Sequence, residues 1–402
     1  MTYDLLILGG GIAGTTAAAL SARKGLRTAL LCGGQLGGVC LHSGCIPAKF
    51  CLQNDFPDDA SRAKRRADVI GTLSEGLLSR LERVDIFYEN GALRGKTDVF
   101  SVLCGVRGLT AKNVLLCTGS VPHRPGLSPE DIFTSDTLPQ RAVILGAGAA
   151  GLECASYLRK SGADVTLLEQ RDRLLPQAEP EISAALLRSF RRRGIAVRFG
   201  VDTPPKGETV IFADGRVPAV RGIGLRTVGL AKVVTDAHMQ TAVPGLYAAG
   251  DVRGEEMTAH AAAREAQCAV RRICGEADAV DYRALPHVLF TDPAVMWVGE
   301  TQRGAQERGV QARAVTVPLR SVGGYLAAGG DGTGVCRLVA DGAGTILGVH
   351  LCGGDAPELS AAAVVLVQQR VRVRELERMT FAHPTVGEAL REAAACLEDR
   401  QS

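Results

Sequence analysis

The chain has 402 residues, of which 46 are basic and 43 acidic, giving a formal net charge of +3. This length predicts two or three domains with ample core, and the balanced charge argues against a nucleic-acid-binding protein or a polybasic membrane anchor. Twelve cysteines are too few for a disulfide scaffold in a chain of this size. We therefore expect a reducing, cytoplasmic environment in which a persistent disulfide would be catalytic.

The N-terminus lacks the features of a targeting segment. Met1 to Asp4 lead directly into an apolar stretch, without the basic region, apolar core and small-residue cleavage site of a signal peptide. No apolar run reaches the roughly 18 residues of a membrane span. We expect no contact with a membrane.

The first element is a strand that ends in a glycine-rich turn. Tyr3 to Leu8 are apolar, Gly9-Gly10-Gly11-Ile12-Ala13-Gly14 follow, and residues 15–24 have a helical pattern. This order predicts a dinucleotide-binding unit, in which Gly9, Gly11 and Gly14 allow the tight turn and the approach of a pyrophosphate. An acid that binds a ribose is expected about 20 residues later, but Cys32 follows the second strand.

Two cysteines lie five residues apart directly after this unit. On a regular helix the Cα atoms of Cys40 and Cys45 would be roughly 8 Å apart, whereas a disulfide requires about 7 Å or less. If the two cysteines form a bridge, the backbone between them is a loop or a distorted turn. The alternatives are two unpaired buried thiols or half of a zinc site, and no second close pair of Cys or His supports a metal site.

The glycine pattern occurs a second time. A strand at 141–145 precedes Gly146-Ala147-Gly148-Ala149-Ala150-Gly151, and a helix and a strand ending at Glu169 follow. The separation from Gly146 to Glu169 is 23 residues, as it is from Gly9 to Cys32, so only the second unit retains the acid. A carboxylate there accepts ribose hydroxyls and repels a 2′-phosphate, which favours NAD over NADP. Arg171 and Arg173 keep NADP open as an alternative.

Two further strand ends carry small or acidic residues. Thr118-Gly119 ends a buried strand, and Gly250-Asp251 ends a strand at 245–249, where the aspartate could bind a ribityl or ribose hydroxyl or cap a helix. A helix at 258–274, which includes Ala259, follows. From residue 285 the pattern becomes short strands, a long apolar helix at 356–370 and a final helix, which predicts a mixed α+β interface domain.

These motifs together resemble the class I pyridine nucleotide-disulfide oxidoreductases, above all those that act on dihydrolipoamide. The resemblance covers nearly the whole chain and depends on both glycine fingerprints, the Cys40–Cys45 segment ending in Ile46-Pro47-Ala48-Lys49, and His383-Pro384-Thr385 with Glu388. It implies an α/β fold with two Rossmann-like domains, for FAD and NAD, and a C-terminal α+β dimerisation domain. The expected domains are 1–122 with 240–280 for FAD, 123–239 for NAD, and 281–402 for the interface.

The resemblance also implies a role for each motif residue. Cys45 is expected next to the flavin, and Cys40 is the thiol that exchanges with substrate. Lys49 is expected beside the flavin and paired with Glu153. His383, oriented by Glu388, is the expected acid/base in the active site of the second subunit of a homodimer. The residues expected to contact the two cofactors are Gly9, Gly11, Gly14, Lys49, Thr118, Gly119, Gly250, Asp251, Ala259, Gly146, Gly148, Gly151, Glu153 and Glu169.

The implied function is oxidation of a protein-bound dihydrolipoyl group with reduction of NAD, with a lipoyl carrier domain or protein as partner. No metal and no nucleic acid are expected. The alternatives are an NAD(P)H-dependent reductase of another small disulfide, such as glutathione disulfide, and a non-catalytic flavoprotein component of a complex. Cys32 departs from the family pattern and puts the FAD ribose contact in doubt.

Overall fold

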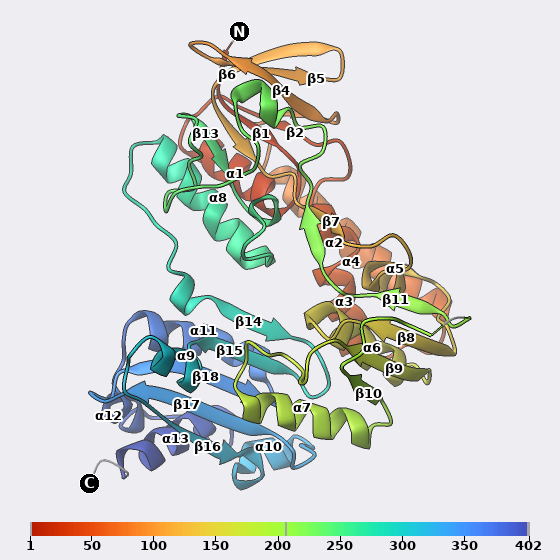
Figure 1. Cartoon of the computed structure of the whole chain (residues 1–402), viewed down its shortest axis with the longest axis vertical. Helices are drawn as coiled ribbons and strands as arrows, with labels where there is room; N and C mark the ends of the chain where they lie inside the picture. The colour runs from red at the N-terminus through yellow and green to blue at the C-terminus, as the bar shows by residue number, and fades with distance from the viewer. Residues whose placement is uncertain (1, 206, 400–402) are drawn as a thin grey trace.

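The computed structural model describes residues 2–205 and 207–399. Figure 1 shows the N-terminal sheet at one end of the molecule and the C-terminal sheet at the other, with a second sheet beside them. The short helices at residues 38–53 lie between the first sheet and the second (Figure 1).

The first sheet has a parallel centre, with β1 lying between β2 and β6. Its spatial order is β3 (Asp85–Phe87), β2 (Thr28–Leu31), β1 (Thr2–Leu8), β6 (Arg107–Leu116), β5 (Phe100–Cys104) and β4 (Gly91–Lys96), with β13 (Leu246–Ala248) also paired to β6. Leu5 and Ile7 pack with residues of α1 (Ile12–Arg23) and α8 (Ala259–Ile273), whereas Leu6 and Leu8 pack on the other face. Both faces are covered, which explains why β1 is almost continuously apolar.

The second sheet repeats this plan with four parallel strands. Its order is β10 (Ala196–Phe199), β9 (Asp164–Glu169), β8 (Arg141–Leu145) and β11 (Val210–Phe212). Its helices are α5 (Pro129–Thr134), α6 (Ala149–Lys160) and α7 (Pro180–Arg192). The chain passes from the first sheet to the second through β7 (Ser120–Pro122) and returns through β12 (Arg216–Pro218). These two strands pair with each other in an antiparallel ribbon.

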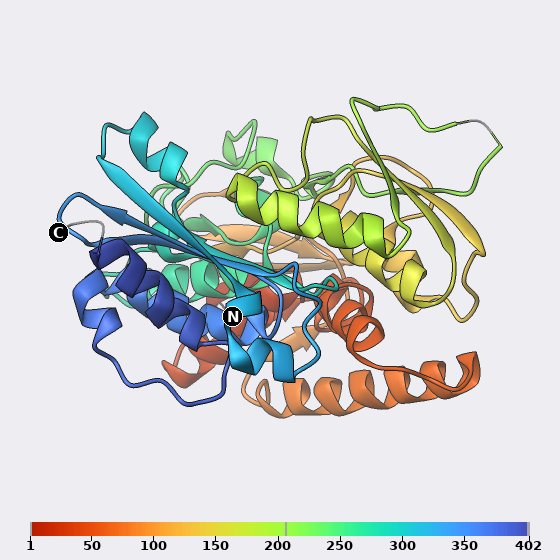
Figure 2. The ribbon, with the colours of Figure 1, turned by 90° about the horizontal axis from the view of Figure 1, so that it is seen from below.

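Three helices follow β2. They are α2 (Gly38–His42), α3 (Cys45–Gln53) and α4 (Asp59–Ser79). Helix α3 packs against α5 and α6, so it joins the two nucleotide-type units. Helix α4 lies along the edge of the molecule in Figure 2, and Arg62 is its only buried residue.

The C-terminal sheet is antiparallel. Its order is β14 (Pro286–Leu289), β15 (Val295–Gly299), β18 (Ile346–Cys352), β17 (Val335–Asp341) and β16 (Ala312–Pro318). The helices of this part are α9 (Gln302–Glu307), α10 (Gly323–Ala327), α11 (Ala356–Gln368), α12 (Val373–Glu377) and α13 (Glu388–Glu398). Among the described residues, the 3₁₀ helices are η1 (Leu225–Val228), η2 (Asp251–Arg253), η3 (Tyr282–Ala284) and η4 (Leu319–Ser321).

The expected fold class is confirmed, with two units of the strand–turn–helix type and a C-terminal α+β part. The strand expected at 141–145 has these limits in the structure. Helix α6 begins at Ala149, three residues earlier than expected. Helix α3 begins at the second cysteine, Cys45. Among the described residues, no helix is long and apolar enough to cross a membrane.

Candidate active site

Cys40 and Cys45 lie on two short helices that meet at a break in the backbone. Cys40 is within α2, and Cys45 is the first residue of α3. Between them, the N–H groups of Ser43 and Gly44 both donate to the carbonyl oxygen of Val39, at 2.9 and 2.6 Å. The distorted turn that a bridge between these cysteines would require is therefore present.

The two thiols are free, and each shifts the pKa of the other. The interaction with the Cys45 thiol lowers the pKa of Cys40, although burial and the charge of Asp251 act in the opposite direction. The pKa of Cys45 is raised, first by its interaction with Cys40 and then by the surrounding protein atoms, with a smaller contribution from the charge of Glu153, although its side chain is exposed in the single chain. The reduced pair therefore ionises first at Cys40, and a thiolate is the nucleophilic form of cysteine.

The segment that carries the cysteines is fixed to the first glycine turn. Gly37 donates its N–H to the carbonyl oxygen of Gly10 at 2.8 Å. Gly38 has a φ of +58°, and a Cβ at this position would lie 2.9 Å from the Cα of Gly11. The close approach of the two backbones places the dithiol next to the first dinucleotide-type turn.

In both glycine turns the first and third glycines lie against other backbone atoms, and the middle glycine is open. A Cβ at Gly9 would lie 2.1 Å from the carbonyl oxygen of Cys117, and one at Gly14 would lie 1.8 Å from that of Gly9. The middle glycine, Gly11, has no atom within 4 Å of its Cβ direction. In the second turn Gly146 and Gly151 are restricted in the same way, and Gly148 is open.

This pattern fits two dinucleotides. The first and third glycines are needed for the turn and for packing, and the middle one leaves room for a pyrophosphate. Helices α1 and α6 begin without a side-chain cap and without an acid in the first turn. Their N-terminal N–H groups are therefore available to an anion.

The two units differ at the residue after the second strand. In the second unit the buried Glu169 accepts the N–H of Ala147 at 2.8 Å and the N–H of Arg171 at 3.0 Å, so its carboxylate lies on the glycine turn. In the first unit the buried Cys32 contacts the carbonyl oxygen of Gly34 at 3.2 Å. A ribose contact by Glu169 stays a prediction.

The other residues expected near FAD surround the ends of the central strands. Thr118 donates its hydroxyl to the carbonyl oxygen of Ala219 at 2.8 Å, and Gly119 has a φ of +75°. Asp251 accepts the hydroxyl of Ser120 at 2.6 Å. The Gly250 N–H donates to Glu265 at 2.7 Å, and Ala259 is the first residue of α8.

The expected ion pair of Lys49 with Glu153 is wrong. Lys49 Nζ lies 3.6 Å from Glu358 on α11 and 4.8 Å from the centre of the Phe290 ring. Glu153 instead accepts the main-chain N–H of Phe290 at 2.8 Å, and burial raises its pKa to about 7. Phe290 therefore contacts both residues, and a carboxyl group that is neutral for part of the time attracts a lysine less strongly.

His383 and Glu388 are brought together as expected. The Nδ1 of His383 lies 3.1 Å from Glu388 Oε1, and Glu388 Oε2 also accepts the N–H of Thr385 at 3.0 Å. These bonds lower the pKa of Glu388. In the single chain the His383 side chain is 77% exposed, so its other ring nitrogen is available to a further group.

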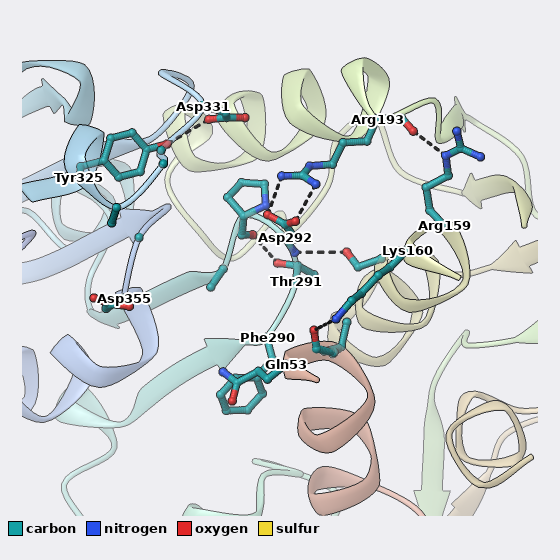
Figure 3. Close-up of a pocket in the computed structure, with 18 of the residues that line it drawn as sticks. Gln53, Arg159, Lys160, Arg193, Phe290, Thr291, Asp292, Tyr325, Asp331 and Asp355 are labelled. Atoms are coloured by element: carbon teal, nitrogen blue, oxygen red, sulfur yellow. Dashed lines mark hydrogen bonds and ion pairs between the residues drawn. The ribbon is translucent and has the colours of Figure 1, made fainter. Parts of the chain in front are cut away.

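The structure also has a cavity of about 620 Å³ that neither cysteine lines (Figure 3). It lies between α6, α7 and the segment from Phe290 to Ala294. Several of its charged side chains are already paired: Arg193 binds Asp292 at 2.6 Å, and Lys160 binds Asp55 at 3.0 Å. We assign no reaction to this cavity.

Phe290 and Glu358 were not anticipated as neighbours of Lys49. Both contacts join residues that lie more than 200 positions apart in the sequence, so no local pattern indicated them.

Comparison with known proteins defines the class. The model of the pyridine nucleotide-disulphide oxidoreductases matches residues 3–204 and 202–266, and that of their dimerisation domain matches residues 285–394. The chain belongs to this family of enzymes, in which dihydrolipoyl dehydrogenases use FAD and NAD(H). The C-terminal match supports a homodimer.

Individual proteins are similar to this chain over nearly its whole length. The chain is 31% identical to a dihydrolipoyl dehydrogenase of Cupriavidus necator, over 99% of this chain and 98% of the relative, and 33% identical to that of Chlorobaculum tepidum, over 98% and 96%. Among solved structures, LpdA of Mycobacterium tuberculosis has a TM-score of 0.90 at 22% identity, covering 98% of this chain and 99% of that chain. The HOCl-induced flavoprotein disulfide reductase RclA of Escherichia coli has a TM-score of 0.88 at 23% identity, with the same coverage, and both structures show the shared fold.

Proposed function

We propose that the protein oxidises a protein-bound dihydrolipoyl group and reduces NAD through the Cys40–Cys45 pair and FAD. The observation that carries this proposal is the pair of free thiols beside the first glycine turn, on either side of the distorted turn that a disulfide between them would require. The names of the relatives support the choice of substrate. Residues 1–122 with 240–280 are the proposed FAD domain, 123–239 the NAD domain, and 281–402 the interface domain.

In the oxidised protein Cys40 and Cys45 form a disulfide. His383 of the partner subunit takes a proton from one substrate thiol, and the resulting thiolate attacks the sulfur of Cys40, which breaks the Cys40–Cys45 bond and releases Cys45 as a thiolate. The second substrate thiol then attacks the mixed disulfide, which releases the cyclic disulfide product and leaves Cys40 and Cys45 reduced. FAD, when bound, would supply the two-electron redox chemistry that links the dithiol to NAD.

The remaining residues hold groups in place. Glu388 orients the His383 ring, because it accepts a hydrogen bond from Nδ1 when this nitrogen is protonated. The turn formed by Gly9, Gly11 and Gly14 would hold the FAD pyrophosphate, and the turn formed by Gly146, Gly148 and Gly151 would hold that of NAD. The proposed partners are a second copy of this chain and a lipoyl carrier, in the cytoplasm.

A steady-state assay compares dihydrolipoamide plus NAD with glutathione disulfide plus NADPH. The proposal requires turnover of the first pair and little turnover of the second. Preference for the second pair would make the protein a reductase of a small disulfide. A Cys45→Ser variant that retains all biological activity would instead indicate a non-catalytic flavoprotein.

A further inference from the structure

The first nucleotide-type unit has a gap in its hydrogen bonding that the second unit does not. In the second unit the N–H of Ala147 donates to Glu169 at 2.8 Å. The equivalent residue, Gly10, is also buried, but its N–H has no acceptor among residues 2–205 and 207–399. Buried N–H groups are nearly always paired, so this one indicates a missing partner.

Cys32 explains the gap. A Cβ at Gly10 would lie 2.2 Å from Cys32 Sγ, so the thiol occupies the place from which a longer carboxylate would reach Gly10. A thiol is only a weak acceptor and a weak donor. It cannot bind the two hydroxyls of a ribose as a carboxylate does.

Asn90 lies at the same edge of the sheet. Strand β3 runs parallel to β2, with Phe87 opposite Leu31, and Cys32 donates its N–H to the carbonyl oxygen of Phe87 at 2.8 Å. Asn90 follows β3 by three residues. The carboxyl ends of parallel strands meet at one edge, and that edge is where such sheets bind nucleotides.

The Asn90 side chain lies against Gly33, the residue after Cys32. A Cβ at Gly33 would be 1.9 Å from Asn90 Oδ1, and Gly33 does not have a left-handed φ. The absence of a side chain at Gly33 therefore provides space for the carboxamide. The exposed Asn90 carboxamide has no hydrogen-bond partner within the part of the chain that the structure describes.

The neighbouring acid does not offer an alternative. Glu89 lies 3.6 Å from Arg107, and it also accepts the Cys104 thiol at 3.8 Å. Its carboxylate is therefore directed toward β5 and β6. Asn90 is left as the unpaired polar side chain that contacts the residue following Cys32.

We propose that Asn90 replaces the missing acid and holds the adenosine ribose of FAD. A carboxamide can accept from one ribose hydroxyl and donate to the other, which a single thiol cannot do. This inference rests on the proposed assignment of the first unit to FAD. It makes Asn90 a binding residue for the cofactor and gives Gly33 the role of leaving room for it.

The test is the dissociation constant of FAD, measured by flavin fluorescence on the purified dimer and its variants. Asn90→Ala should raise the constant roughly tenfold, as expected for the loss of one or two hydrogen bonds. Gly33→Ala should have a similar effect, because its Cβ would displace the carboxamide. Gln140→Ala, which removes an exposed carboxamide before β8, should leave FAD binding unchanged.

A rescue variant separates a binding role from a folding role. Cys32→Glu supplies a carboxylate within reach of the Gly10 N–H, so Cys32→Glu combined with Asn90→Ala should retain FAD about as well as the wild type. NADH binding should be the same in all variants. An unchanged dissociation constant in Asn90→Ala would overturn the inference and leave the proposed function intact. A wild-type protein that binds no FAD would instead overturn the proposed function.

Discussion

The carboxylate of Glu153 accepts the main-chain N–H of Phe290 at 2.8 Å, which joins the start of α6 to the segment after β14. The Phe290 ring in turn lies 4.8 Å from Lys49 Nζ, on the helix that begins at Cys45. One residue of the C-terminal part thus contacts both the second nucleotide-type unit and the dithiol helix. A substitution at Glu153, Phe290 or Lys49 should therefore affect the positions of the other two side chains.

Glu153 predicts an unusual dependence of stability on pH. Burial raises its pKa from 4.5 to about 7. The folded protein keeps this proton where the unfolded chain has lost it, so the contribution is present below pH 4.5 and is lost as the pH rises to 7. Relative to the wild type, Glu153→Gln should gain on the order of 3 kcal/mol in free energy of unfolding between pH 4.5 and pH 8.

Urea unfolding at several pH values measures this difference. Glu75→Gln, at an exposed position of α4, should follow the wild type throughout. Parallel curves for the wild type and Glu153→Gln would show that the Glu153 carboxyl titrates normally.

The lowered pKa of Cys40 predicts the order of alkylation. In protein reduced with NADH, iodoacetamide below pH 9 should modify Cys40 before Cys45, because the thiolate is the reactive form. Mass spectrometry of the peptides gives both rates, with the exposed Cys396 as an internal reference. Faster modification of Cys45 would reverse the assigned roles of the two thiols.

His383 should serve only the thiol half of the reaction. His383→Gln should slow turnover of dihydrolipoamide by at least about 100-fold, since general acid–base catalysis contributes this much or more. Reduction of the flavin by NADH should keep its rate in a stopped-flow measurement. His123→Gln removes another imidazole near a carboxylate, 3.7 Å from Asp214, and should leave both rates unchanged. Equal slowing of the two half-reactions would argue against the assignment of His383.

Glu169 should determine the choice of nicotinamide cofactor. Glu169→Gln removes the charge that would repel a 2′-phosphate, so the ratio of kcat/KM for NADPH to that for NADH should rise roughly tenfold. The exposed neighbour Asp172 provides a matched variant, Asp172→Asn, which should keep the wild-type ratio. If Glu169→Gln also keeps it, cofactor choice depends on other residues.

The fold was largely predictable because its signals are local. The two glycine turns and the apolar runs before them identify β1, α1, β8 and α6 with errors of a few residues. The pairing of His383 with Glu388 was also within reach, since the two are five residues apart. The contacts of Lys49 were not, because they depend on how α11 and Phe290 pack against α3, and no local pattern encodes such packing.

The measurement that tests the central claim most directly is the redox state of Cys40 and Cys45 under anaerobic conditions. Free thiols are alkylated, the protein is digested, and the peptides are identified by mass spectrometry before and after one equivalent of NADH. We predict a disulfide between Cys40 and Cys45 in the oxidised protein, its conversion to two alkylated thiols by NADH, and its return on addition of lipoamide. Thiols that are already alkylated in the oxidised protein, or a disulfide that NADH does not open, would contradict the account.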